Sequence, residues 1–336
     1  MTGNPDGGRA EREAHEAIDR AMTAAHYTHA EAREAECWFD ADRVASEPAT
    51  TAWKRLARWR QARWRDAQGY PIGSDPLRGG LRAKRVGSRI ALDFARESGA
   101  NLVTPQALAA ARGRLALPEP ARSFDVEALW ADLLSPSALS FNLFGTLAGS
   151  AAVAERAVAA WWPKLAHGSV SLRFEHSPSG HETLLLGGPD VFNAAFEVEG
   201  SAGSAILGVN VKYHEHAAAE PAPDPDALAR QVAVAERSGV FRRGWQPRVI
   251  GTGLQRIWQE HLLVLSLLQH PARHWTHGCY VLVYPALNPS FAAAVLHYRE
   301  LLSDFATFET TTIEGLLHTQ GALDRATRDV VQARYT

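Results

Sequence analysis

Two strand-like segments joined by a short glycine-containing turn constrain the fold of this chain more than any other feature. The segments are VFNAAFEV (191–198) and AILGVNVKY (205–213), and the intervening EGSAGS has the composition of a hairpin turn. A third segment, SVSLRFEHS (169–177), alternates apolar and polar residues and precedes them. The chain is therefore expected to build part of its core on an antiparallel sheet.

Helical patterns surround these strands. A further strand, GCYVLVYP (278–285), follows a helix-like stretch at 254–268 and precedes another at 291–305. Helices, then a hairpin, then helix–strand–helix predict an α/β fold with a mixed sheet. The length of 336 residues suggests two units or one large domain with an extension. We expect an N-terminal tail and helices over 1–50, a basic, mainly helical extension over 51–125, and the α/β core over 126–330.

The composition excludes several classes of protein. Lys plus Arg is 35 and Asp plus Glu is 37, so the net charge of -2 excludes a polybasic chain, and any nucleic-acid surface must be local. The two cysteines, Cys37 and Cys279, are too few for a disulfide framework and fit a reducing cytoplasm. No apolar run reaches the roughly 18 residues of a membrane helix, and the first twenty residues lack a signal-peptide core. We expect a cytoplasmic protein.

The hairpin brings three polar side chains together. If its turn is centred on Ser201–Ala202, Asn193 lies opposite Asn210, and Lys212 projects from the same face as Asn210. An unpaired charge inside a sheet costs several kcal/mol, so Lys212 is expected to have a partner. The two Asn side chains are the first candidates for that partner.

These segments, in their order and spacing, resemble a known family. FEHSP (174–178), FN (192–193) and LGVNVKYHE (207–215) resemble the core strands of the PD-(D/E)XK, or restriction-endonuclease-like, nuclease superfamily, in a bacterial branch of largely unknown function. The resemblance extends over most of the chain from about Trp53. It implies a restriction-endonuclease-like core with a central mixed β-sheet flanked by helices, plus a mainly helical N-terminal extension.

The resemblance also implies a chemistry. In this superfamily an Asp and a Glu or Asp on adjacent strands hold Mg²⁺, and a Lys two residues after the second acid assists the attacking water. Here Asn193 and Asn210 stand at the acid positions, while Lys212 is kept. A carboxamide offers one neutral oxygen where a carboxylate offers two charged ones, so Mg²⁺ binding is expected to be weak or absent.

Three further residues complete the candidate site. Asp190 follows Pro189 and would be the first acid in a register shifted by three residues, whereas Glu175 matches a Glu of the family and would supply a ligand from the neighbouring strand. Gln255 lies on a helix from which some members of the superfamily point a Gln at the active site. The alternative for Gln255 is an exposed helical side chain.

The segment from Lys54 to Arg89 is strongly basic and contains Trp53, Trp59 and Trp64. The spacing of the three Trp residues is compatible with one helical face, which would anchor the helix to the core. The charges predict a surface for nucleic acid or an acidic partner. The residues expected to bind nucleic acid are Lys54, Arg55, Arg58, Arg60, Arg63, Arg65, Arg82, Lys84 and Arg85.

Other chemistries lack their motifs. The chain has no phosphate-binding Walker loop, serine-hydrolase elbow, HExxH pair or dinucleotide glycine fingerprint, and His270, His274, His277 and Cys279 match no zinc signature.

Three hypotheses remain. The favoured one is a nucleic-acid-binding protein, with DNA preferred over RNA, whose magnesium site is degenerate and which cleaves little or not at all. The second is an active Mg²⁺-dependent nuclease that uses Glu175, Asp190 and Lys212. The third is a non-catalytic subunit of a defence or repair system that binds a protein partner.

Overall fold

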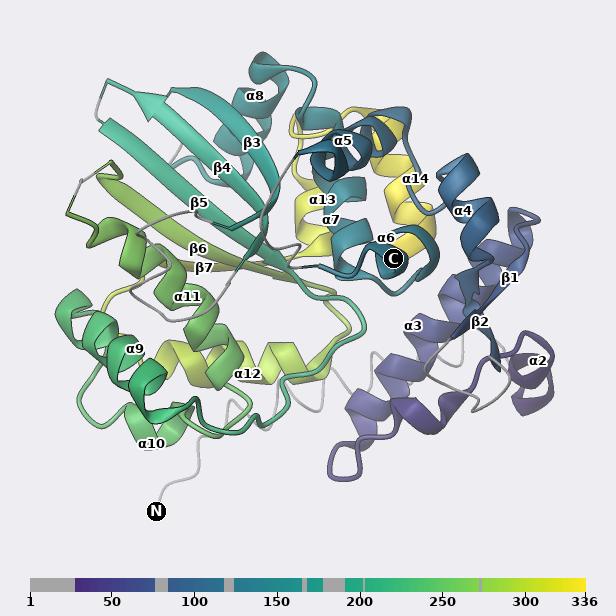
Figure 1. Ribbon diagram of the computed structural model, residues 1–336, viewed down its shortest axis with the longest axis horizontal. Coiled ribbons are helices and arrows are strands. Elements are labelled where there is room, and N and C mark those ends of the chain that lie inside the picture. Colours follow the sequence, from purple (N-terminus) through teal and green to yellow (C-terminus); the bar gives the residue numbers. More distant parts are fainter. Residues whose placement is uncertain are drawn as a thin grey trace.

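A five-stranded mixed sheet lies at the centre of the computed structural model, which describes residues 28–75, 84–117, 124–164, 168–177, 191–201, 203–271 and 274–336 (Figure 1). The strand order is β3-β4-β5-β6-β7. The first three strands pair antiparallel, and β5, β6 and β7 pair parallel. The strands are β3 (Ser169–His176), β4 (Phe192–Gly200), β5 (Gly203–Val211), β6 (His277–Tyr284) and β7 (Phe308–Thr312).

The β4–β5 hairpin has the predicted register. Gly200 pairs with Gly203, and Ala194 pairs with Val209, so Asn193 and Asn210 face each other at the next position. Gly208 is required because the Phe192 ring lies over it, and a Cβ there would come within 2.2 Å of a ring carbon. The expectation of a strand hairpin is confirmed.

Helices cover both faces of the sheet (Figure 1). Alternation along β5 divides the core: Val209 and Val211 pack into one hydrophobic cluster, and Ile206 packs into the other. The first cluster is covered by α5 (Pro105–Ala116), α7 (Pro136–Phe144), α8 (Ala151–Trp161), α13 (Ile313–His318) and α14 (Arg325–Tyr335). The second is covered by α9 (Pro225–Ser238), α10 (Gln246–Val249), α11 (Gln255–Leu268) and α12 (Pro289–Glu300).

The basic segment forms α3 (Pro48–Ala67), which packs between two hydrophobic clusters. Trp53 is fully buried against the main core, whereas Trp59 packs against Ala32, Ala35 and Cys37 on another side of the helix. The burial of these two Trp side chains agrees with the prediction. The prediction that they share one face of the helix is wrong. The other N-terminal elements are α2 (His29–Glu34), η1 (Phe39–Asp42), α4 (Leu92–Ser98), α6 (Val126–Ala131) and a further short helix, η2 (Gly145–Leu147).

Several elements were not predicted from the sequence. After α3 the chain forms a small antiparallel pair, β1 (Ile72–Asp75) and β2 (Lys84–Ile90), where only loop and helix were expected. The edge strand β7 and the C-terminal helices α13 and α14 were also missed. Among the described helices none can cross a membrane alone, although the bent pair Pro136–Leu147 and Ala151–Trp161 passes by length and composition.

Candidate functional site

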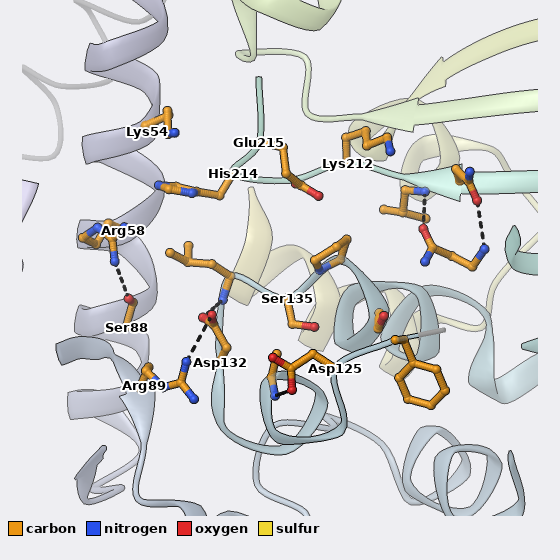
Figure 2. Close-up of a pocket in the computed structure, with 18 of the residues that line it drawn as sticks. Lys54, Arg58, Ser88, Arg89, Asp125, Asp132, Ser135, Lys212, His214 and Glu215 are labelled. Atoms are coloured by element: carbon orange, nitrogen blue, oxygen red, sulfur yellow. Dashed lines mark hydrogen bonds and ion pairs between the residues drawn. The ribbon is translucent and has the colours of Figure 1, made fainter. Parts of the chain in front are cut away.

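A cleft of about 560 Å³ opens where the carboxyl end of β5 meets α3 (Figure 2). Its lining comes from separate parts of the chain, which α3, the α6–α7 connection, the sheet and α11 bring together. The polar residues that line it are Lys54, Arg58, Asp75, Ser88, Arg89, Asp125, Asp132, Ser135, Ser137, Glu175, Asn193, Asn210, Lys212, His214, Glu215, Arg256 and Glu260. The structure therefore places Glu175, Asn193, Asn210 and Lys212 in one cleft.

The two Asn side chains join β4 to β5. The backbone N–H of Asn193 donates to Oδ1 of Asn210 at 2.9 Å, and the backbone N–H of Val211 donates to Oδ1 of Asn193 at 2.9 Å. The Asn193 amide nitrogen donates to Oε1 of Glu175 at 3.1 Å. Both amide oxygens are thus occupied by backbone donors that continue the strand pairing.

Lys212 has a partner that the sequence did not indicate. Its Nζ donates to Oε1 of Glu260 on α11 at 2.7 Å, and Nε of Arg256 donates to the same oxygen at 3.0 Å. The Tyr280 hydroxyl donates to Oε2 at 2.5 Å. Burial opposes ionisation of Glu260, which is 2% exposed, but the charges of Lys212 and Arg256 outweigh it and hold its pKa at about 2. Two cations around one carboxylate leave one net positive charge.

Glu175 occupies a constrained position at the end of β3. Its φ of 44° is unusual for a residue with a Cβ, and Arg114 holds the turn by donating to the carbonyl oxygens of Phe174 and Glu175. Burial raises the pKa of the Glu175 carboxyl to about 7, against the hydrogen bonds from Ser137 and Asn193 and the charges of Arg114 and Lys212. Glu175 is therefore close to half protonated at neutral pH.

The raised pKa of Glu175 predicts a pH-dependent stability. The folded state binds the proton of Glu175 more tightly than the unfolded chain does. The protonated carboxyl therefore stabilises the fold fully below about pH 4.5, and this stabilisation is lost as the pH rises through about 7. Glu175→Gln keeps an acceptor for Asn193 and cannot ionise. We expect the variant to exceed the natural protein in unfolding free energy by roughly 3 kcal/mol at pH 8, with little difference near pH 4.5. Urea unfolding across this pH range measures the difference in unfolding free energy. A difference that does not change with pH would contradict the prediction.

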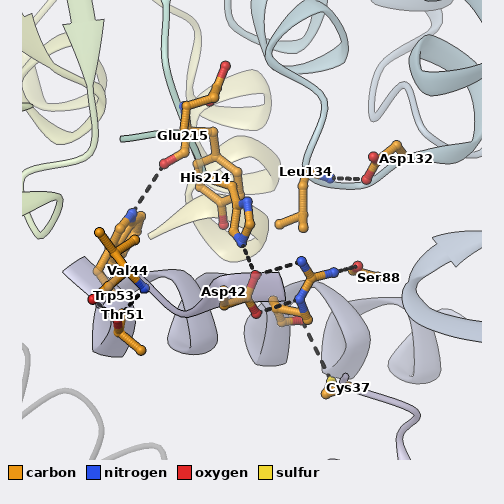
Figure 3. A network of polar contacts seen from close by, with 12 residues as sticks. Cys37, Asp42, Val44, Thr51, Trp53, Ser88, Asp132, Leu134, His214 and Glu215 are labelled. Atoms are coloured by element: carbon orange, nitrogen blue, oxygen red, sulfur yellow. Dashed lines mark hydrogen bonds and ion pairs between the residues drawn. The ribbon is translucent and has the colours of Figure 1, made fainter. Parts of the chain in front are cut away.

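A buried network connects the cleft to the N-terminal segment (Figure 3). Asp42, which has no exposed surface, accepts two hydrogen bonds from Arg58 at 2.7 Å, and its Oδ1 lies 2.8 Å from Nε2 of His214. Arg58 also donates to the Ser88 hydroxyl at 2.9 Å. Burial opposes ionisation of Asp42, but these hydrogen bonds hold its pKa well below the usual range. Burial lowers the pKa of His214 more than the Asp42 carboxylate raises it.

The structure corrects part of the predicted nucleic-acid surface. Arg58 reaches the lining of the cleft but is buried and paired with Asp42, and Arg65 is buried with its guanidinium on Asp66 and the Tyr70 carbonyl. Neither guanidinium lies on an exposed face of α3, as the prediction of a surface required. These two assignments are wrong because helix α3 is packed on more than one side.

The other basic residues divide between surfaces. Lys54 lines the cleft, whereas Arg60 and Arg63 line a separate hollow. Arg55 lies over the Phe39 ring, Lys84 lies over the Trp38 ring, and Arg85 pairs with Glu36. Arg82 lies outside the described residues.

Neither Gln255 nor Asp190 is among the described residues that line the cleft. Gln255 is buried outside the cleft, where its oxygen accepts from the Gly251 N–H and its nitrogen donates to the Pro221 carbonyl. Gln255 was expected either to face the active site or to be an exposed helical side chain. Both expectations are wrong, because its side chain is buried and hydrogen-bonded to the loop before α9. Asp190 lies outside the described residues.

The arrangement of the strands agrees with a comparison of the sequence with protein families. A family model described as the PD-(D/E)XK nuclease superfamily matches residues 48–336. The chain belongs to this superfamily. No curated protein and no solved structure gives a significant match. Asp42, which holds His214, precedes the matched segment.

The residues present do not fit the Mg²⁺ ion that nucleases of this superfamily generally use. Mg²⁺ requires hard, preferably charged oxygen ligands. The two Asn oxygens accept backbone N–H groups, and among the described residues Glu175 is the one carboxylate beside them, with a pKa of about 7. Within the described residues no group of three or more His, Cys, Asp and Glu side chains is arranged to hold a metal ion.

Proposed function

We propose that this protein binds nucleic acid in the cleft and has lost metal-dependent cleavage. The observation that carries the proposal is the pair Asn193 and Asn210, whose amide oxygens join β4 to β5 instead of facing a metal. Such a pair keeps the strands in register without the charge repulsion that two carboxylates would bring. The superfamily's site is thereby turned into a structural contact.

A local positive charge beside the Asn pair supports the binding part of the proposal, although the lining as a whole has five Lys and Arg against six Asp and Glu side chains. Lys212 and Arg256 share Glu260 and leave one net positive charge next to the uncharged Asn pair, and 47% of the Arg256 side chain is exposed. Lys54, which is 8% exposed, and Arg89, which pairs with Asp132, line the same cleft. Phosphate groups are the natural ligands of such cations. We propose DNA as the preferred ligand, and the experiment below compares it with RNA.

The test is a salt titration of binding to labelled DNA and RNA oligonucleotides, followed by fluorescence anisotropy. The logarithm of the binding constant should fall linearly with the logarithm of the salt concentration. The variant Lys54→Gln, Arg256→Gln should bind more weakly and reduce the slope by about 2, since each lost phosphate contact releases about one counterion fewer.

The control is Arg325→Gln, which removes one cation from α14. The Arg325 side chain is 86% exposed and pairs with Asp329. This control should bind like the natural protein. Equal slopes for the cleft variant and the natural protein would show that nucleic acid does not use the cleft.

A further inference from the structure

The size of the cleft limits what can enter it. A volume of about 560 Å³ falls within the roughly 300–1,000 Å³ of small-ligand sites. The walls come from α3, from β2 and the α6–α7 connection, which are bridged at Arg89 and Asp132, and from the strand ends of the sheet (Figure 2). A DNA duplex, whose major groove alone is about 12 Å wide, can only lie across the opening. An unpaired nucleotide has the size of such a small ligand and can enter.

Acidic side chains make the cleft unfavourable for a duplex. Asp125, Asp132 and Glu215 line it, and each is held in place: Asp125 caps α6, Asp132 pairs with Arg89 at 3.6 Å, and Glu215 accepts from the Tyr213 N–H at 2.8 Å. A duplex carries one phosphate charge per roughly 1.7 Å of its axis. Phosphates laid across the opening would therefore meet carboxylates that cannot easily move away.

The same carboxylates suit unpaired bases. Carboxylate oxygens accept hydrogen bonds from base amino groups, which in a duplex are engaged in pairing or confined to the grooves. The cleft also contains the apolar side chains of Leu134 and Val191 and the Phe124 ring. The Arg114 guanidinium lies over one face of that ring, 5.6 Å from its centroid, so a base would stack on the other face. Stacking of a base on an aromatic ring stabilises single-strand binding by roughly 1–3 kcal/mol.

We propose that the cleft takes a single-stranded segment or end, with a phosphate at Lys212 and Arg256 and a base against Phe124 and the acidic residues, and that it discriminates against duplex. This inference rests on the proposed binding of nucleic acid. It specifies the class of ligand: a strand with at least one unpaired nucleotide.

The experiment compares three labelled probes of one sequence: a single-stranded DNA, the same RNA, and the blunt DNA duplex. At one salt concentration the single strands should bind at least about tenfold more tightly than the duplex, a difference of about 1.4 kcal/mol. The diagnostic variant is Asp125→Asn, Glu215→Gln. Asn is as good a helix cap as Asp, and the Gln oxygen still accepts from the Tyr213 N–H, so two charges are removed and the hydrogen bonds are kept. This variant should bind duplex several-fold more tightly than the natural protein does, so its preference for single strands over duplex should be smaller.

The control Asp329→Asn removes one exposed charge from α14 and should leave the preference unchanged. Phe124→Ala provides a second variant, and it should weaken single-strand binding and leave duplex binding unaltered. Duplex binding as tight as single-strand binding by the natural protein would overturn the inference and leave the proposed function standing. Failure of all three probes to bind would overturn the proposed function itself.

Discussion

Replacing Asp42 by Asn is expected to lower the free energy of unfolding by about 3–5 kcal/mol, because the change leaves the buried Arg58 guanidinium without its counter-charge. Asp42 has no exposed surface, so solvent cannot replace the lost partner. The loss is a large part of the stability of an ordinary domain. Urea unfolding at pH 7 measures it.

A double-variant cycle separates this loss from a general effect of mutation. Arg58→Met in the Asp42→Asn background removes the unpaired charge, so the double variant should lose much less than the sum of the two single losses. Asp329→Asn, which breaks an exposed pair with Arg325, should change stability by less than about 0.5 kcal/mol. Additive effects of the two buried changes would contradict the account of this network.

Alternation in the sequence predicted the hairpin and the side chains that its register brings together. The period of two places Asn210 and Lys212 on one face, and the two-residue turn sets Asn193 opposite Asn210. Both relations are local, so the chain's own order was enough to find them. Glu175 followed from the resemblance to the superfamily, although its φ of 44° and its contact with Arg114 did not.

Long-range contacts explain what could not be predicted. Glu260 meets Lys212 only because α11 packs across the sheet, and its neighbour Arg256, four residues before it, was the one local sign of a charged cluster. Arg58 was assigned to a nucleic-acid surface because a run of basic residues does not reveal which side of a helix is covered. Asp42, sixteen residues before Arg58, covers that side.

Restoring the acids should create a metal site. In Asn193→Asp, Asn210→Glu the two carboxylates would stand beside Glu175, with Lys212 in its superfamily position. Without metal the variant should be less stable than the natural protein, because the Asn193 amide that now donates to Glu175 becomes a second carboxylate. Mn²⁺ should raise its melting temperature. Each single change should have much less effect, since the acids act together around the ion.

The comparison of melting curves with and without Mn²⁺ uses the natural protein, both single variants and the double variant. The natural protein should show no metal-dependent shift. An equal shift in all four proteins would mean that the ion binds elsewhere, and no shift in any of them would mean that this arrangement of strands does not support a metal.

The proposed loss of metal-dependent cleavage is tested most directly on the natural sequence. The measurement is cleavage of plasmid and single-stranded oligonucleotide with Mg²⁺, with Mn²⁺ and with chelator, for the natural protein and for Lys212→Ala. We predict no cleavage above background by either protein under any of these conditions. Metal-dependent cleavage by the natural protein that disappears in Lys212→Ala would contradict the account and would direct attention to Asp190 as the missing acid.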